Sequence, residues 1–174
     1  SLHPAKSVTL IMAVIARATN FLLFILKPPN RCTFANNADY IILESDISNE
    51  DDVKAIYSTV MERYERIDIL VNNAAEGDMD GLDTIEKITP NVIDDTFAVN
   101  VRGSIMMTRE MINHRGDYGR IINLSTDASQ VFAGQITYGA SKATLEALTR
   151  SIALEVAKYG ITVNCVAPGP TQTG

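Results

Sequence analysis

The feature that most constrains the fold is a regular alternation of short apolar runs and longer segments with helical spacing, from Tyr40 to Ala167. Each run has the length of a buried strand, and each segment repeats apolar residues three or four positions apart, as on one face of a helix. Strands are expected at 40–43, 67–71, 120–124 and 161–167, with helices near 51–64, 90–112 and 138–159. This order predicts an α/β fold, a doubly wound parallel sheet with helices on both faces.

The ends of these helices carry capping residues. Ser48 and Asp51 resemble a capping box ahead of the first helix. Thr89 followed by Pro90 gives the second helix an N-cap and a proline at its first position, and Gly160 is expected to end the third. The second helix also repeats apolar residues every fourth position, and this stripe is expected to face the core. The stripe consists of Ile93, Phe97, Val101 and Ile105, with Thr108 on the same side.

The bulk composition narrows the class of protein. The chain has 174 residues, enough for one domain, and no linker or repeat divides it. Its net charge of −6 argues against a nucleic-acid partner, which needs a basic surface. With 2 histidines, neither a zinc site nor a histidine-based triad is favoured, so no metal is expected. Cys32 and Cys165 show no pairing pattern and are expected to be reduced thiols in a cytoplasmic protein.

Residues 1–38 form an atypical N-terminal segment of the single domain 1–174, and the regular core follows at 39–174. Within the segment, Val8–Leu26 is mostly apolar and near the length that crosses a bilayer. Arg17 and several polar side chains interrupt it, which favours a buried strand with a short helix or a second strand. A membrane segment and a signal peptide are the alternatives.

Polar residues follow the predicted strands at the point where each strand ends. In an open parallel sheet, ligands bind outside the carboxyl ends of the strands. The sequence therefore predicts a site at this edge of the sheet. The residues concerned are Asp46, Asn72, Asn73, Ser125, Thr126, Pro168 and Gly169.

Tyr138 and Lys142 lie just beyond one of these strand ends, one turn apart at the start of a helix. A neighbouring ammonium group favours the phenolate, so the pKa of Tyr138 is expected to fall below its ordinary value near ~10. A phenol tuned in this way can give or take a proton in a reaction. A Tyr and a Lys at this spacing also occur by chance, so the surrounding residues decide the interpretation.

Several short motifs stand along the chain in a fixed order. They are Asp46-Ile47, Asn72-Asn73-Ala74-Ala75, Val99-Asn100-Val101, Gly119-Arg120-Ile121-Ile122-Asn123, the pair Ser125-Thr126, Tyr138-x-x-x-Lys142 and Pro168-Gly169. In this order they resemble the short-chain dehydrogenase/reductase family, over residues 39–174, and most of all bacterial members of the 3-oxoacyl-(acyl-carrier-protein) reductase type. The resemblance implies a Rossmann-like domain and an NAD(P)-dependent oxidoreductase that interconverts a carbonyl and a secondary alcohol.

The resemblance implies roles for a small set of residues. Tyr138 would be the general acid/base that protonates the carbonyl oxygen or deprotonates the alcohol. Lys142 would lower the pKa of Tyr138 and hold the nicotinamide ribose, and Asn100 would orient Lys142 through a water. Ser125 would hydrogen-bond the substrate oxygen. Thr126 is the alternative, because the thirteen-residue spacing before Tyr138 favours Ser125, whereas alignment of the preceding strand favours Thr126.

The resemblance also implies NAD or NADP as the cofactor, with both choices open, and a small carbonyl or alcohol compound as the substrate. The cofactor would run along the carboxyl edge of the sheet, from the adenine to the nicotinamide. In addition to Tyr138 and Lys142, the implied cofactor-binding residues are Asp46, Ile47, Asn73, Ala74, Ala75, Pro168, Gly169 and Thr173.

The chain departs from the family pattern at both ends. Family members begin with a glycine-rich turn that seats the pyrophosphate, yet no glycine precedes Gly77 here. Charge-assisted hydrogen bonds contribute about 1.5–3 kcal/mol each, so their loss should weaken dinucleotide binding by several kcal/mol. The chain also ends soon after Pro168-Gly169, where relatives continue, and the domain is expected to be truncated at both ends.

Two functional interpretations follow. The first is an NAD(P)-dependent oxidoreductase, and the second is a catalytically impaired remnant that acts as a binding or oligomerisation scaffold. Helices 90–112 and 138–159 form the main assembly surfaces in relatives, so a homo-oligomer is expected in both cases. Attachment to a membrane through Val8–Leu26 is a weaker third interpretation.

Overall fold

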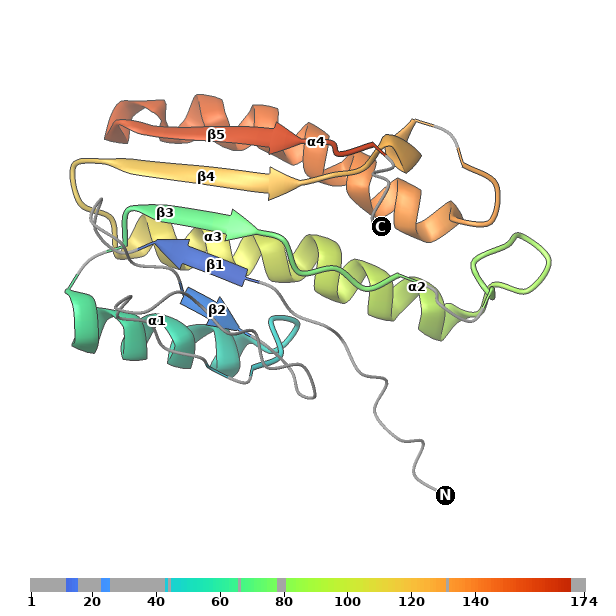
Figure 1. Cartoon of the computed structure of the whole chain (residues 1–174), viewed down its shortest axis with the longest axis horizontal. Helices are drawn as coiled ribbons and strands as arrows, with labels where there is room; N and C mark the ends of the chain where they lie inside the picture. The colour runs from blue at the N-terminus through green and yellow to red at the C-terminus, as the bar shows by residue number, and fades with distance from the viewer. Residues whose placement is uncertain are drawn as a thin grey trace, which may run out of the picture.

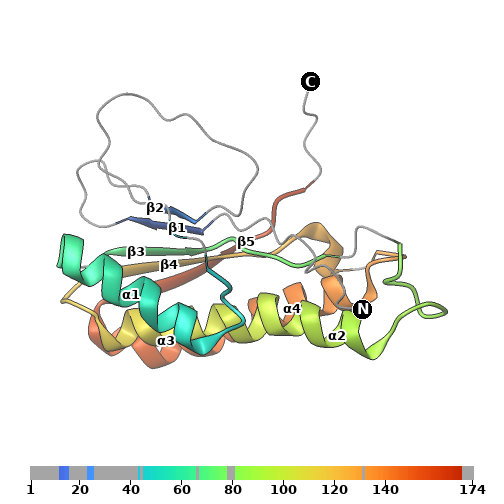
Figure 2. The ribbon, with the colours of Figure 1, turned by 90° about the horizontal axis from the view of Figure 1, so that it is seen from below.

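The computed structural model describes residues 12–15, 23–25, 43, 45–65, 67–77, 81–130 and 132–169. Within them, a five-stranded sheet lies over a layer of helices (Figures 1 and 2). The predicted α/β class is confirmed. The strand predicted at 40–43 lies outside the described residues apart from Leu43, as do Cys32 and Thr173.

Three strands form a parallel unit. They are β3 (Ile69–Asn72), β4 (Gly119–Leu124) and β5 (Ile161–Val166). β4 lies between the other two, with Val71 opposite Ile122 and Ile122 opposite Asn164. Parallel strands present their carboxyl ends at one edge, so the polar residues after these strands meet there, beyond the arrowheads in Figure 1.

Two further strands, β1 (Met12–Ile15) and β2 (Leu23–Ile25), give the order β2-β1-β3-β4-β5. β1 pairs antiparallel with both β2 and β3, so this side of the sheet differs from the predicted parallel order. Positions 16–22 alone separate β1 from β2. A parallel connection needs a crossover of about a dozen residues or more, so this link is too short for one.

The two strands also bear on the interpretation of Val8–Leu26. The prediction of a strand with a second strand is confirmed, whereas a membrane helix through this segment is not compatible with β1 and β2. In the part of the chain that the structure describes, no helix is long and apolar enough to cross a bilayer.

The helices follow the predicted periodicity. Those of the described residues are α1 (Glu50–Tyr64), α2 (Pro90–Phe97), α3 (Ser104–Asn113) and α4 (Ile136–Val156). A π-helical turn, Ala98–Gly103, joins α2 to α3, so the predicted helix 90–112 is one continuous rod. This α2–α3 rod comprises residues 90–113.

The caps agree with the sequence in two of three places. Thr89 caps α2, and Gly160 ends the α4 segment with a left-handed φ of 72°. The cap of α1 is Asn49 rather than the predicted Ser48, because the Asn49 side chain accepts the N–H of Asp51 at 2.8 Å.

The described helices all lie on one face of the sheet (Figure 2), so one of the two predicted helical layers is present in the described part of the chain. The reason is topological. β3, β4 and β5 follow one another in one direction across the sheet, and right-handed crossovers then place the connecting helices on the same face. Along β5, Ile161 and Val163 are buried, while Thr162 and Asn164 on the other face are exposed.

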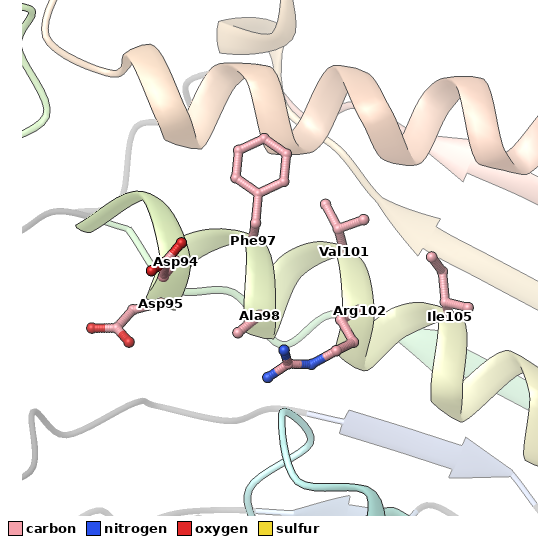
Figure 3. Close-up of a pocket in the computed structure, with 7 residues that line it drawn as sticks. All are labelled: Asp94, Asp95, Phe97, Ala98, Val101, Arg102 and Ile105. Atoms are coloured by element: carbon pink, nitrogen blue, oxygen red, sulfur yellow. The ribbon is translucent and has the colours of Figure 1, made fainter. Parts of the chain in front are cut away.

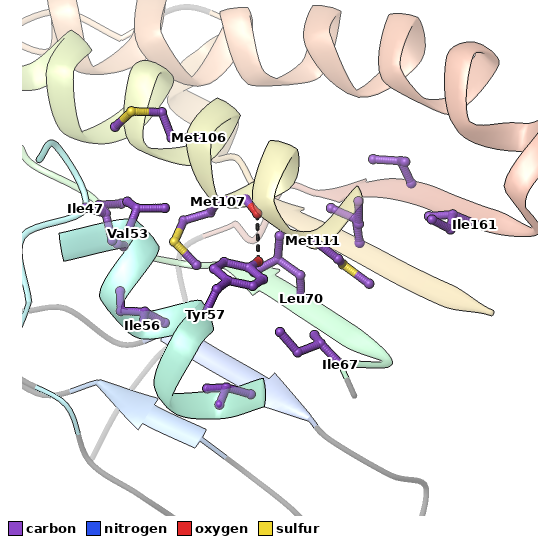
Figure 4. Packing of buried hydrophobic residues seen from close by; sticks show 14 of the residues in the cluster. Ile47, Val53, Ile56, Tyr57, Ile67, Leu70, Met106, Met107, Met111 and Ile161 are labelled. Atoms are coloured by element: carbon purple, nitrogen blue, oxygen red, sulfur yellow. Dashed lines mark hydrogen bonds between the residues drawn. The ribbon is translucent and has the colours of Figure 1, made fainter. Parts of the chain in front are cut away.

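The core lies between these helices and the sheet (Figure 4). Its largest fully buried side chain, Tyr57 of α1, donates a hydrogen bond of 2.7 Å to the backbone O of Met107 in α3. Leu70 of β3 is also fully buried. Gly103 allows a close approach, since a Cβ at this position would lie 2.8 Å from the side chain of Ile47. The π turn is thereby packed against the loop that leads into α1.

The four apolar residues of the predicted stripe lie on an outer face of the α2–α3 rod, which corrects the expectation that they face the core, whereas Thr108 is buried as predicted. Ile93 is 40% exposed and Ile105 is 41% exposed, and Phe97 and Val101 are only partly buried. A second face of the rod is buried instead. Both faces repeat at helical spacing, so periodicity alone does not identify the inner one. The buried residues are Thr96, Val99, Asn100, Gly103, Ser104, Met106, Met107, Thr108, Glu110 and Met111.

Candidate active site

The predicted site forms where the carboxyl ends of β3 and β4 meet the first turns of α4 (Figure 1). Ser125 extends the pairing of β4 with β5 by donating its N–H to Val166 O at 2.7 Å. α4 begins at Ile136, which places Tyr138 and Lys142 in its first two turns. The candidate catalytic side chains therefore come from the rod, from the loop after β4 and from α4.

Tyr138 and Lys142 are neighbours in space. The Nζ of Lys142 lies 5.7 Å from the centre of the Tyr138 ring. The ring is partly buried, and the loop after β3 packs against it: a Cβ on Gly77 would lie 3.4 Å from Tyr138 Cδ2. The phenol is thus held beside both this loop and the amine.

The pKa of Tyr138 lies above its ordinary value of 10, which corrects the expectation that Lys142 lowers it. Burial of the phenol is the main cause, and the negative charge of Asp127 acts in the same direction. The ammonium group of Lys142 instead turns to the backbone, where its Nζ donates a hydrogen bond of 2.7 Å to Leu124 O. Tyr138 is therefore a protonated phenol at neutral pH in this structure.

Lys142 is almost fully buried, with 2% of its surface exposed. Burial lowers its pKa from the ordinary 10.5 to about 8, and the effect of Cys165 acts in the opposite direction. A strongly perturbed lysine beside a partly buried phenol is typical of functional sites.

Asn100 holds the loop after β3 to α4. It is fully buried in the π turn, and its Oδ1 accepts from Glu76 N at 2.7 Å while its Nδ2 donates to Glu76 O at 2.8 Å. The same Nδ2 donates to Ser141 Oγ at 2.9 Å, and Ser141 Oγ donates to Tyr138 O at 2.7 Å. Asn100 thus acts on the site through its neighbours, and its orientation of Lys142 through a water stays a prediction.

The two candidate hydroxyl groups have different surroundings. Ser125 is 5% exposed, and its Oγ donates a hydrogen bond of 2.6 Å to Glu146 Oε1. Glu146 Oε1 also accepts a hydrogen bond of 2.5 Å from Ser129 Oγ. Thr126 is more exposed, and its Oγ1 accepts the N–H of Ala128 at 3.3 Å as the cap of a short 3-10 turn. The Thr126 hydroxyl also donates to a carboxylate, Asp127 Oδ1, at 3.1 Å. Both hydroxyl groups are therefore engaged, Ser125 in a shorter and more buried hydrogen bond and Thr126 in a longer one closer to the surface.

Two carboxylates of the site were not predicted. The pKa of Glu146 is lowered, first by the hydrogen bond from Ser125 and then by that from Ser129. Its position one turn after Lys142 was a usable signal, because residues four apart share a helical face. Asp83, from the loop after β3, accepts hydrogen bonds from the first turn of α4 and carries no such local signal.

The residues predicted beside the adenine lie in the turn before α1. The Asp46 carboxylate accepts the Ser48 N–H at 2.9 Å, and the Asp46 N–H donates to Asp52 Oδ2 at 2.8 Å. The side chain of Ile47 is buried in the core against Gly103. The Asp46 side chain therefore stabilises the turn in which it lies. Because the Ile47 side chain is buried, a ligand could contact this residue only through its backbone.

The remaining predicted contacts follow β3 and β5. Ala74 is buried, with Asn73 and Ala75 partly exposed around it. Pro168 and Gly169 are exposed beyond β5, and a Cβ on Gly169 would meet nothing within 4 Å.

A pocket of about 570 Å³ lies away from these residues, on the α2–α3 rod (Figure 3). It contains none of the predicted catalytic or cofactor-binding residues, so it is distinct from the candidate active site. Three members of the outward apolar stripe belong to its lining. The lining residues are Asp94, Asp95, Phe97, Ala98, Val101, Arg102 and Ile105.

Known proteins are similar to this chain over most of its length. A family model described as short chain dehydrogenase matches residues 26–174. The (2S)-[(R)-hydroxy(phenyl)methyl]succinyl-CoA dehydrogenase subunit BbsD of Thauera aromatica is 37% identical over 131 residues, which cover 74% of this chain and 52% of that protein. The NADPH-dependent aldehyde reductase 2, chloroplastic, of Arabidopsis thaliana is 39% identical over 137 residues, which cover 76% of this chain and 50% of that protein.

Solved structures share the fold. The 3-ketoacyl-(acyl-carrier-protein) reductase from Brucella melitensis, complexed with NADH, matches with a TM-score of 0.70 and 30% identity, covering 75% of this chain and 55% of that one. A short chain dehydrogenase from Burkholderia cenocepacia in complex with NADP matches with a TM-score of 0.72 and 33% identity, covering 78% and 55%. The chain spans about half the length of the curated relatives it matches.

Proposed function

The chain belongs to the short-chain dehydrogenase family, and on this premise we propose that it is an NAD(P)-dependent oxidoreductase that interconverts a carbonyl and a secondary alcohol. The observation that carries the proposal is the pairing of a partly buried phenol, Tyr138, with a buried amine, Lys142, at the carboxyl edge of parallel strands. Ligands of open α/β sheets bind at this edge, so the two side chains lie where they could act on a bound substrate.

Tyr138 would transfer the proton. Because burial and Asp127 raise its pKa, the phenol carries its proton at neutral pH and can donate it to a carbonyl oxygen. For alcohol oxidation the phenol must first lose this proton, and a charged Lys142 near its oxygen would favour that loss. The amine would then have to leave its hydrogen bond with Leu124 O.

NAD or NADP would supply or accept the hydride. Lys142 would hold the nicotinamide ribose, and the open space at Gly169 would border the nicotinamide. The relatives complexed with NADH and with NADP support this cofactor class. The residues proposed to hold the cofactor are Asp46, Ile47, Asn73, Ala74, Ala75, Tyr138, Lys142, Pro168, Gly169 and Thr173.

Thr126 is the better candidate for the hydroxyl that binds the substrate oxygen, although spacing favours Ser125. Each hydroxyl donates to a carboxylate, Ser125 to Glu146 at 2.6 Å and Thr126 to Asp127 at 3.1 Å. The bond of Ser125 is shorter and more buried, so it is the harder one to break before the hydroxyl could bind substrate. We expect Thr126→Val to lower kcat/KM by about 10²-fold, as the loss of one such donor does elsewhere. Ser125→Ala should have a much smaller effect, and the reverse order of the two variants would return the role to Ser125.

The substrate-independent part of the proposal is tested by titrating NADH and NADPH into the protein and following their fluorescence. Binding tighter than about millimolar favours the enzyme. NADH and NADPH oxidation is then measured with a set of small ketones and aldehydes. Tyr138→Phe should abolish turnover, while NADH and NADPH still bind through the other residues proposed to hold the cofactor. Turnover that survives in Tyr138→Phe would contradict the role given to the phenol.

A scaffold without chemistry is the second candidate function, and the outward apolar residues of the α2–α3 rod favour it. In both cases we propose that a second copy of the chain covers the outward apolar stripe and the pocket beside it (Figure 3). Helices 90–112 and 138–159 would form the contact. Ile105→Asp should convert an assembled species to monomer in analytical ultracentrifugation, and a monomeric wild type would refute this interface. A cytoplasmic location stays a prediction.

A further inference from the structure

The N-terminus of α4 is not capped by the residue that precedes the helix. Gln135, just before it, makes no capping hydrogen bond with its side chain. Asp83, which is 1% exposed in the loop between β3 and α2, serves the first turn instead. Its carboxylate accepts the Thr137 N–H at 2.8 Å and the Tyr138 N–H at 3.0 Å, and its backbone O accepts the Ile136 N–H at 3.3 Å. These are donors that a helix leaves unpaired at its start.

Burial makes this contact a strong constraint. A buried carboxylate is unfavourable unless hydrogen bonds and nearby positive charge compensate for the lost water. Asp83 has the N–H groups around it, a further hydrogen bond of 2.6 Å from the Thr137 hydroxyl, and the positive end of α4 against it. These hydrogen bonds are lost if Asp83 and the first turn of α4 separate, and 54 positions of sequence lie between them.

The loop that carries Asp83 also touches the Tyr138 ring. Gly77 packs against the ring, and Asn100 fixes the neighbouring residue Glu76 through two hydrogen bonds. Tyr138 is therefore held at two points by one loop: at its backbone N–H through Asp83, and at its ring through Gly77.

We propose that Asp83 is a positioning residue for Tyr138: it fixes the backbone that carries the phenol and so sets the direction in which the proton is donated. The inference rests on the proposed function, in which Tyr138 transfers the proton. Proton transfer requires the donor within hydrogen-bond reach of the reacting oxygen. A displacement of about 1 Å can cost about 10²-fold in rate, so a loosened cap should appear in kcat.

The main test compares Asp83→Asn with a matched control. Asp83→Asn keeps the size of the side chain and one acceptor oxygen, but it places an NH₂ group where the second oxygen accepted an N–H. Thr89→Ala is the control, because Thr89 caps α2 by accepting the Val92 N–H at 3.4 Å. Both variants lose a helix cap, but only Asp83 bonds to the Tyr138 backbone.

In steady-state carbonyl reduction, we expect Asp83→Asn to lower kcat about tenfold or more, with the KM for NADH within about twofold of wild type. Thr89→Ala should leave both kcat and the KM for NADH within about twofold of the wild-type values. Equal losses of kcat in Asp83→Asn and Thr89→Ala would overturn the inference.

A second measurement does not depend on turnover. The chain has 6 Tyr, and with ¹³C-labelled tyrosine the Tyr138 resonance is identified by its absence in Tyr138→Phe. This resonance should move in Asp83→Asn and stay in place in Thr89→Ala. A wild type without turnover would refute the proposed function, while the resonance still decides whether Asp83 positions Tyr138. An unmoved resonance in Asp83→Asn would overturn the inference in either case.

Discussion

Replacing Lys142 should change how the stability of the protein depends on pH. Lys142 is 2% exposed, and burial lowers its pKa from 10.5 to about 8. Below this folded-state pKa, both the folded and the unfolded chain carry the ammonium, and the folded chain must bury it. At higher pH, up to 10.5, the folded chain releases the proton while the unfolded chain keeps it. The free energy of unfolding therefore rises with pH across this window.

The magnitude follows from the two pKa values. Their difference is about 2.5, and since each pKa unit corresponds to about 1.4 kcal/mol, the rise amounts to about 3 kcal/mol. Solvent screening reduces this rise in the free energy of unfolding only slightly, because the side chain is almost fully buried. Burial also raises the pKa values of Tyr138 and Cys165, which lowers stability as pH rises. The variants share these groups, and Lys142→Arg also keeps the positive charge that acts on Cys165, so its difference from wild type reports the titration of Lys142.

The assay is urea unfolding of wild type, Lys142→Met and Lys142→Arg at several pH values. Neither variant can release a proton at position 142 in this range. The free energy of unfolding of wild type minus that of each variant should rise by about 1.4 kcal/mol per pH unit above about pH 8, with the same slope for both variants. A difference that stays flat with pH would refute the reasoning that the amine is buried in its charged form.

Two further predictions concern packing. Tyr57→Phe should lower the free energy of unfolding by about 1 kcal/mol, because it removes the buried hydrogen bond to Met107 O; an unchanged urea midpoint would contradict this. Gly139→Ala should destabilise by about 1–3 kcal/mol although Ala favours helices, because its Cβ would lie 2.7 Å from Ala128 O. Gly116→Ala is the control in thermal unfolding, as its Cβ meets nothing within 4 Å. Equal unfolding temperatures for the two glycine variants would show that this close approach is not rigid.

The parts of the fold that depend on neighbouring residues could be predicted from the sequence. The start of α2 at Thr89-Pro90 and the left-handed turn at Gly160 are decided within a few residues of each position. The parallel unit of β3, β4 and β5 follows from the alternation of strands with helices, which leaves few other ways to bury each apolar face.

The parts that depend on distant residues could not be predicted. The stripe around Ile105 was misplaced because both faces of the rod repeat at helical spacing, and the inner face mixes apolar residues such as Met107 with the polar Asn100. The pKa of Tyr138 was expected to fall because sequence spacing brings Lys142 near it, but spacing does not reveal that Leu124 O takes the ammonium group. Asp83 accepts hydrogen bonds from residues about 54 positions away, and a local sequence pattern cannot predict a contact over this separation.

In the proposed reaction, Tyr138 would donate a proton to the carbonyl oxygen, and NADH or NADPH would supply the hydride to the carbonyl carbon. The most direct measurement follows deuterium from 4-deuterated NADH or NADPH into the product alcohol by mass spectrometry, in wild type and in Tyr138→Phe. We expect deuterium on the alcohol carbon with wild type, and transfer at least about 10²-fold slower with Tyr138→Phe. No transfer by wild type at saturating cofactor, or equal transfer by the two proteins, would contradict the role of Tyr138.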